Sequence, residues 1–120
     1  MKVVVTSQGK DLTSAVDPRF GRAQYFVVVD TDTGNFTAQD NKQNVNAVQG
    51  AGIQAGKNVA DSGAQALISG NVGPNAFATL NAAGIEVYVK ASGTVQDAVD
   101  ALKAGKLEKA GKANVQGHWM

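Results

Sequence analysis

Both arginines of the chain lie in one short loop, residues 17–22, between two strand-like runs. Arginine presents a planar, permanently charged fork of donors, which suits an anion held partly out of water. Pro18 fixes its own backbone angle, and Gly21 permits a turn or a close backbone approach. Two interpretations are open: an anion site on Arg19 and Arg22, or an ordinary connection whose Phe20 plugs into the core.

A second glycine-bearing loop, residues 70–74, comes directly before a predicted helix. The start of a helix offers unpaired backbone N–H groups and a partial positive charge to an anion. Taken alone, the loop could equally be a simple strand-to-helix turn. If both loops lie at one edge of a sheet, the anion site is favoured, and its candidate residues here are Gly70, Asn71, Val72, Gly73 and Pro74.

The chain has no cysteine and a single histidine, His118, near its glycine-containing end. Thiolate zinc sites, protein-thiolate iron–sulfur ligation, disulfides and cysteine nucleophiles are therefore excluded. His118 could fold back with Trp119 and Met120 as a lid that carries metal donors, or it could simply be exposed.

Other ligand classes have weak support in the sequence. The glycines of residues 50–57 do not have phosphate-loop spacing, and the partial dinucleotide pattern lacks its acidic residue, so close packing is the better interpretation. The net charge of +1 gives no field for nucleic acid or an acidic membrane. With no apolar run near ~18 residues and no signal pattern, we expect a soluble cytoplasmic protein.

The hydrophobic pattern predicts an α/β domain over residues 1–105, followed by a basic, glycine-rich tail over 106–120 that we expect to be loosely ordered. The predicted order is three strands, then helix, strand, helix, strand and helix, which gives a mixed five-stranded sheet. If the first strand lies between the hairpin and the fourth strand, loops 7–22 and 70–74 leave the same carboxyl edge. Open α/β sheets bind ligands there. The elements are expected at residues 2–6, 25–30, 35–40, 47–61, 65–69, 74–83, 85–89 and 94–104.

Residues 17–26, Asp-Pro-Arg-Phe-Gly-Arg-Ala-Gln-Tyr-Phe, followed by residues 70–76, Gly-Asn-Val-Gly-Pro-Asn-Ala, resemble the dinitrogenase iron-molybdenum cofactor biosynthesis family. The resemblance covers about residues 1–105. It implies a ribonuclease H-like fold without nuclease activity, and the family includes carriers of molybdenum-containing clusters. A single cysteine-free domain with a Gly-His-Trp ending resembles members that hold a sulfide-bridged molybdenum-copper cluster non-covalently.

These observations lead us to expect a monomeric metal-binding protein that is not an enzyme. The resemblance implies that its ligand is an anionic molybdenum-copper sulfide cluster, which the protein would store or deliver to a protein recipient. Arg19 and Arg22 would neutralise charge, and the backbone of residues 70–74 would donate hydrogen bonds. Phe20 and Val72 would shield the cluster from water. Gly21 and His118 are the remaining candidate residues of the site. The alternative is a cofactor-free interaction module, with the lysine-rich tail as a docking segment; nucleotide or hydrolytic chemistry ranks last.

Overall fold

Runs of β-branched and apolar residues form the central strands of the computed structural model, which describes residues 1–41 and 50–113. The strands make one mixed sheet in the order β3-β2-β1-β4-β5-β6. Pairs β3–β2, β2–β1 and β5–β6 are antiparallel, whereas β1–β4 and β4–β5 are parallel. The strands are β1 (Lys2–Ser7), β2 (Tyr25–Asp30), β3 (Phe36–Asp40), β4 (Ala66–Ile68), β5 (Glu86–Val89) and β6 (Glu108–Lys109).

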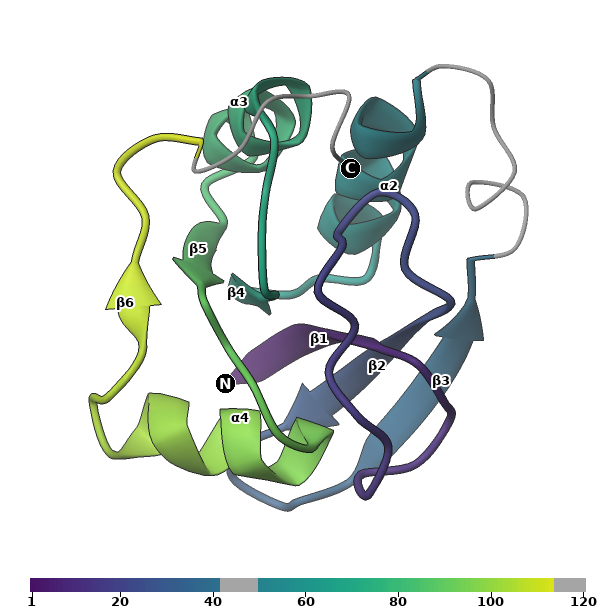
Figure 1. Ribbon diagram of the computed structural model, residues 1–120, viewed down its shortest axis with the longest axis vertical. Coiled ribbons are helices and arrows are strands. Elements are labelled where there is room, and N and C mark those ends of the chain that lie inside the picture. The colour runs from purple at the N-terminus through teal and green to yellow at the C-terminus, as the bar shows by residue number, and fades with distance from the viewer. Residues whose placement is uncertain (42–49, 114–120) are drawn as a thin grey trace.

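Helices cover both faces of the sheet (Figure 1). Helices α2 (Ala51–Asp61) and α3 (Pro74–Ala82) lie on one face, and α4 (Val95–Lys103) lies on the other. Successive residues of the strands alternate between the two layers: Val4 and Leu67 join the core below α2 and α3, and Val3 and Ile68 join the core against α4. The first strand is central, as expected, so the loops after β1 and β4 start from neighbouring strand ends.

The expectation of five strands is wrong, because β6 adds a sixth strand inside the lysine-rich segment. The Ala110 N–H donates to the Val87 carbonyl oxygen at 2.8 Å, which ties this segment to β5. Ion pairs join Lys109 to Glu86 at 3.2 Å and Lys90 to Glu108 at 3.4 Å. Residues 108–110, which belong to the segment expected to be a tail, are therefore bonded to β5.

Glycines let α2 approach α3 closely. A Cβ atom at Gly52 would lie 3.2 Å from Ala76 Cβ, and one at Gly56 would lie 2.7 Å from Thr79 Cγ2. The close-packing interpretation of these glycines is confirmed. α2 begins after Gly50, and residues 47–49 of the predicted helix lie outside the described residues.

Local signals for the other two helices are confirmed. Pro74 lies in the first turn of α3, and Thr94 and Asp97 form a reciprocal capping box at the start of α4. Gly84 and Gly105 follow these two helices with positive φ angles of 75° and 70°.

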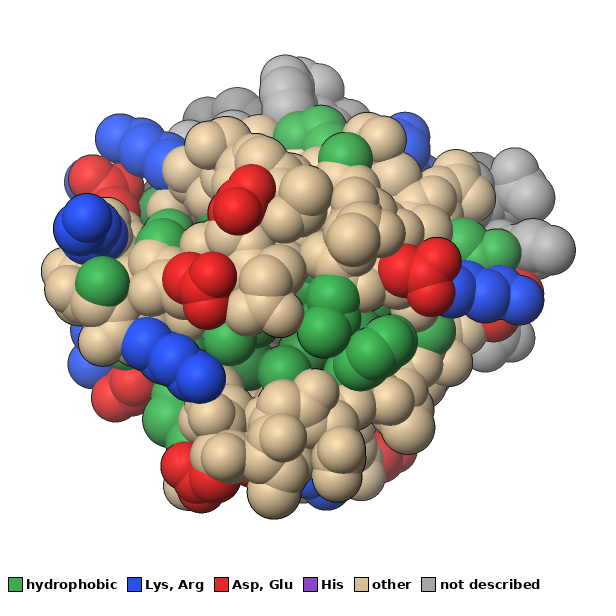
Figure 2. Space-filling model, turned by 90° about the horizontal axis from the view of Figure 1, so that it is seen from below, with side chains coloured by type: hydrophobic (Ala, Val, Ile, Leu, Met, Phe, Trp, Pro, Cys, Tyr) green, Lys and Arg blue, Asp and Glu red, His purple; other side chains and the backbone are tan. Residues whose placement is uncertain are grey.

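The α4 side of the molecule presents hydrophobic side chains gathered in a patch that charged side chains border (Figure 2). At the edge of the sheet, every residue of β3 is exposed, including Phe36 at 40%. No helix within residues 1–41 and 50–113 is long and apolar enough to cross a membrane.

Candidate functional site

The loop that carries the arginines and the loop before α3 are in direct contact. A Cβ atom at Gly70 would lie 2.7 Å from Pro18 Cα and 2.9 Å from the Pro18 carbonyl oxygen. The Asn71 Nδ2 donates to the same carbonyl oxygen at 3.0 Å. The expectation that these two loops meet is therefore confirmed, and Gly70 is required for the approach because a side chain would collide with backbone.

The start of α2 also contacts residues 17–22, here called the arginine loop. The arginine loop, residues 70–74 and the start of α2 are together called the junction. A Cβ atom at Gly21 would lie only 2.8 Å from the backbone nitrogen of Gly52, so the arginine loop rests on the first turn of α2. Gly52 in turn packs against Ala76 in the first turn of α3. Two helix starts, each with a partial positive charge, thus adjoin the loop that carries both arginines. The glycine pattern of α2 predicts close packing, but nothing in the sequence indicates that the start of α2 adjoins the arginine loop.

Hydrogen bonds at the end of β1 fix the positions of both loops. The Asp17 N–H donates to the Thr6 carbonyl oxygen at 2.9 Å, and the Thr6 hydroxyl donates back to the Asp17 carbonyl oxygen at 2.7 Å. The same hydroxyl lies 3.0 Å from the hydroxyl of Ser69, which precedes Gly70. A buried polar contact therefore connects β1, the arginine loop and the end of β4.

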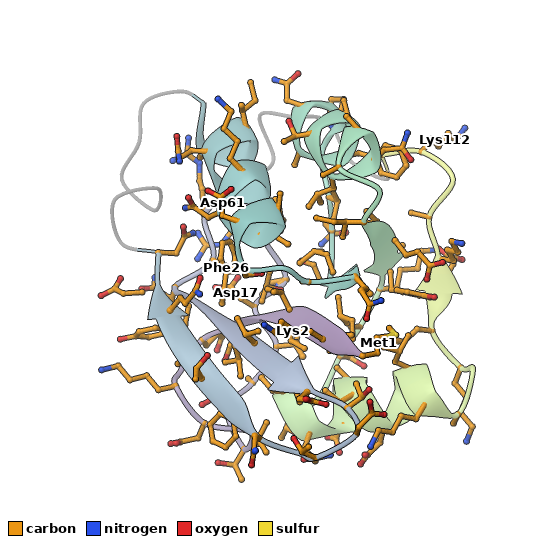
Figure 3. The ribbon with its side chains drawn as sticks, turned by 180° about the vertical axis from the view of Figure 1, so that it is seen from behind. Met1, Lys2, Asp17, Phe26, Asp61 and Lys112 are labelled. Atoms are coloured by element: carbon orange, nitrogen blue, oxygen red, sulfur yellow. The ribbon has the colours of Figure 1, made fainter. Side chains whose placement is uncertain are left out.

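The carboxylate of Asp17, which Figure 3 labels, bonds within the arginine loop, and 1% of its side chain is exposed. One oxygen accepts from the Arg19 N–H at 3.0 Å, and the other accepts from the Gln24 N–H at 3.2 Å. The Arg19 Nε lies 3.5 Å from the first oxygen, while 40% of the Arg19 side chain is exposed. Arg22 is half-buried in the same loop. The loop thus presents Arg19 to solvent while a buried carboxylate holds it.

Phe20 and Val72 lie in the core and have no exposed surface. The Phe20 ring stacks on that of Phe26, with ring centroids 5.6 Å apart. In this conformation the two side chains anchor their loops from below, so the water-excluding role expected for them does not follow from their position. His118 lies outside the described residues.

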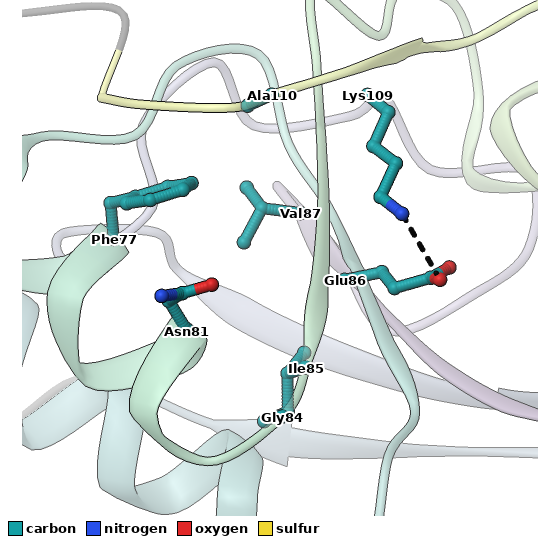
Figure 4. Close-up of a pocket in the computed structure, with 8 residues that line it drawn as sticks. All are labelled: Phe77, Asn81, Gly84, Ile85, Glu86, Val87, Lys109 and Ala110. Carbon is teal, nitrogen blue, oxygen red and sulfur yellow. Dashed lines mark hydrogen bonds and ion pairs between the residues drawn. The ribbon is translucent and has the colours of Figure 1, made fainter.

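A separate hollow of about 180 Å³ lies between α3, β5 and β6 (Figure 4). Its charged groups are already paired, since Lys109 bonds to Glu86 at 3.2 Å and the Tyr88 hydroxyl donates to the same carboxylate at 3.0 Å. The Tyr88 bond, followed by that of Lys109, lowers the pKa of Glu86 below its ordinary value of 4.5. The hollow contains none of the expected site residues; it is lined by Phe77, Asn81, Gly84, Ile85, Glu86, Val87, Lys109 and Ala110.

Within the part of the chain that the structure describes, side chains that bind metals directly do not gather at the junction. Among residues 1–41 and 50–113, no three His, Cys, Asp or Glu side chains are placed to hold a metal ion. What the junction offers instead is guanidinium charge and the backbone N–H groups of helix starts, which are groups that recognise anions.

The chain is similar to known proteins over most of its length. The sequence profile of the dinitrogenase iron-molybdenum cofactor family matches residues 1–105, which include both loops and the starts of both helices. The chain belongs to this family. Its similarity to the apo form of the orange protein from Desulfovibrio gigas reaches 43% identity and a TM-score of 0.92, over 95% of this chain and 96% of that one.

Two further proteins are similar to this chain over most of its length. A NifB-like protein from Thermotoga is 41% identical, with a TM-score of 0.83, over 97% of this chain and 98% of that one. An uncharacterized protein from Methanocaldococcus jannaschii is 29% identical over 96 residues, which is 78% of this chain and 81% of that protein. Membership of the family and these likenesses indicate a cofactor-related role.

Proposed function

We propose that this protein binds an anionic molybdenum-copper sulfide cluster non-covalently, and stores it or delivers it to a protein recipient. The binding place is the junction of residues 17–22, residues 70–74 and the start of α2. The observation that carries the proposal is the convergence of both arginines of the chain with two helix starts, at loops that Gly70 and Asn71 hold against Pro18.

The groups at the junction fit such a ligand. A cluster whose metals are already saturated by sulfide needs no protein thiolate, and this chain has none. The negative charge of the sulfides would be offset by Arg19 and Arg22, and backbone N–H groups at the helix starts would donate hydrogen bonds to them. The similarity to the orange protein supports the proposal, because a structure solved in an apo form belongs to a protein with a separable bound group.

Metal uptake by the purified protein tests the proposal directly. Protein isolated without added metal is examined by visible absorption and metal analysis, and is then mixed with tetrathiomolybdate and copper. We expect uptake of both metals in a fixed ratio to protein, with a visible absorption band that stays with the protein through gel filtration. Protein that remains colourless and metal-free would contradict the proposal, and would leave the cofactor-free interaction module as the better account.

Substitution of either arginine should weaken the retention of the cluster. Replacing either Arg19 or Arg22 by alanine removes charge-assisted hydrogen bonds worth about 1.5–3 kcal/mol, so the cluster should be retained roughly 10–100-fold less tightly. Release should also begin at lower salt concentration. Retention is measured by dialysis against increasing salt, followed by metal analysis.

The matched control is Lys103→Ala, which removes one positive charge from α4 on the opposite face of the sheet. It should leave retention unchanged. Equal retention by the two arginine variants and the wild type would refute the role of the arginines.

A further inference from the structure

We propose that Asp17 is a positioning residue for the ligand: its carboxylate closes the arginine loop and orients Arg19 before the ligand arrives. The proposal rests on the proposed function of the same site. It gives a role in binding to a residue whose negative charge would, by itself, oppose an anionic ligand.

The two oxygens of the Asp17 carboxylate hold the two ends of the arginine loop together. Oδ1 accepts from the Arg19 N–H at 3.0 Å and Oδ2 accepts from the Gln24 N–H at 3.2 Å, so both arginines lie in the segment that the carboxylate closes. The side chain is 1% exposed. A carboxylate buried to this extent is costly unless its hydrogen bonds and ion pairs compensate, and here those bonds define the shape of the loop.

The same carboxylate restrains the Arg19 side chain. Its Oδ1 lies 3.5 Å from Arg19 Nε, the nitrogen nearest the aliphatic stem, while 40% of the side chain stays exposed. Within the described residues, Asp17 is the side-chain partner of Arg19. A free arginine loses roughly 2 kcal/mol of conformational entropy when it is immobilised. Restraint in the ligand-free protein reduces that loss on binding.

Asp17 is itself fixed by the sheet. Its backbone N–H and carbonyl oxygen both bond to Thr6 at the end of β1, at 2.9 and 2.7 Å. The following residue, Pro18, accepts from Asn71 of the second loop. The orientation of Arg19 therefore follows from the strands through a short chain of contacts, and does not depend on the ligand.

A charge-only role and a positioning role make opposite predictions for the substitution Asp17→Asn. If Asp17 contributes only its charge, removal of that charge makes the site more positive and tightens the binding of an anion. If Asp17 positions the loop, the carboxamide NH₂ of asparagine opposes one of the two N–H donors, that of Gln24 or that of Arg19, and the neutral carboxamide no longer attracts the Arg19 guanidinium. The loop is then closed at one end only, and Arg19 is less restrained. Binding then weakens although the site has become more positive.

The experiment measures the retention of tetrathiomolybdate with copper by wild type, Asp17→Asn and the control Asp100→Asn. Asp100 is an exposed carboxylate on α4, on the opposite face of the sheet, so it gives the same change in net charge at a distance. We expect retention by Asp17→Asn to fall by about 10-fold or more, and retention by Asp100→Asn to stay at the wild-type value. Uptake by the wild type with equal or tighter retention by Asp17→Asn overturns the positioning role alone, whereas no uptake by the wild type overturns the proposed function and this role with it.

Hydrogen exchange in the ligand-free wild type gives a second measurement that does not require the variant to fold. If Asp17 closes the loop before binding, the amide protons of Arg19 and Gln24 exchange well below the rate of an unstructured peptide. Exchange of both amides at the unstructured rate would overturn the proposal, because the loop would then be open in the absence of ligand.

Discussion

At the level of single residues, Gly70 packs so closely against Pro18 that no side chain fits between the two loops of the candidate site. The nearest atoms to a Cβ at this position are the Cα, carbonyl oxygen and carbonyl carbon of Pro18, at 2.7, 2.9 and 3.2 Å. All three are backbone atoms, so they cannot rotate away as the end of a flexible side chain could. The geometry of the site therefore depends on the absence of a single methyl group.

Gly70→Ala should force residues 17–22 away from residues 70–74 and break the bond from Asn71 to Pro18. We expect a loss of about 1–3 kcal/mol in the free energy of unfolding, as for other overpacked positions, together with weaker cluster retention. Urea denaturation and metal analysis measure the two effects. Gly111→Ala is the control, since nothing lies within 4 Å of a Cβ there; unchanged stability of Gly70→Ala would show that the loops are not in contact in solution.

At the level of secondary-structure elements, the close packing of α2 on α3 determines where the two helix starts lie. Gly52 meets Ala76 at one end of the contact, and Gly56 meets Thr79 further along. Glycine in a helix costs about 1 kcal/mol relative to alanine. In α2 that cost allows an approach that places both helix starts beside the arginine loop.

Gly56→Ala should therefore destabilise the protein, although alanine is the better helix former. The new methyl group would lie 2.7 Å from Thr79 Cγ2, and this clash opposes a gain of about 1 kcal/mol in helix propensity. Thr79→Ser removes Cγ2 but keeps the hydroxyl that donates to the Asn75 carbonyl oxygen at 3.0 Å. A double-mutant cycle in urea should show a smaller cost for Gly56→Ala in the serine background. Equal costs in the two backgrounds would contradict direct contact between these positions.

At the level of the whole molecule, a small network of charges joins β6 to the rest of the sheet. Glu86 of β5 accepts from Tyr88 on its own strand and from Lys109 of β6. The hydrogen bond from Tyr88, and then that from Lys109, lowers the pKa of Glu86. Burial, followed by the bond to Glu86, raises the pKa of Tyr88 above its ordinary value of 10.0. The network stabilises the charged form of Glu86 in the folded protein.

The lowered pKa of Glu86 gives a signed prediction for the pH dependence of stability. A carboxyl group with a depressed pKa in the folded state stabilises the fold above its ordinary value of 4.5, and this contribution disappears as the pH falls through the folded-state pKa. Glu86→Gln should lower the stability at pH 7 modestly, because the pair is exposed. It should also flatten the decline below about pH 4.5 in thermal melts.

Asp61→Asn is the control, because Asp61 is an exposed carboxylate at the end of α2, and its substitution gives the same change in charge outside the network of Glu86, Tyr88 and Lys109. A profile for Glu86→Gln that is parallel to the wild-type profile at every pH would contradict the assignment.

The extent to which the sequence predicts this fold depends on how local each signal is. β-Branched runs identify β1 and β2, and the capping residues of α4 and the first-turn proline of α3 act within a few positions of the helix start. β6 has no such signal, since its two residues are charged and its pairing depends on β5. A short strand defined only by its neighbour cannot be found by periodicity.

In the candidate site too, local features could be predicted from the sequence, whereas contacts between distant segments could not. The paired arginines and the glycine loop are visible in the sequence because their residue types are unusual for their positions. The buried state of Asp17 and the contribution of the start of α2 arise from contacts between distant segments. The burial of Phe20 and Val72 could not be predicted either, because an apolar residue in a loop can face a ligand or the core.

The hydrogen bonds of the Thr6 hydroxyl also bear on when the proposed site forms during folding and synthesis. It bonds to Asp17, 11 residues away, and to Ser69, 63 residues away. Contacts over such sequence separations form only after the intervening chain has closed its loops, so they come late in folding. During synthesis, a nascent chain that has not yet reached β4 already carries both arginines but lacks residues 70–74, so the proposed binding place cannot form until at least these residues have been made.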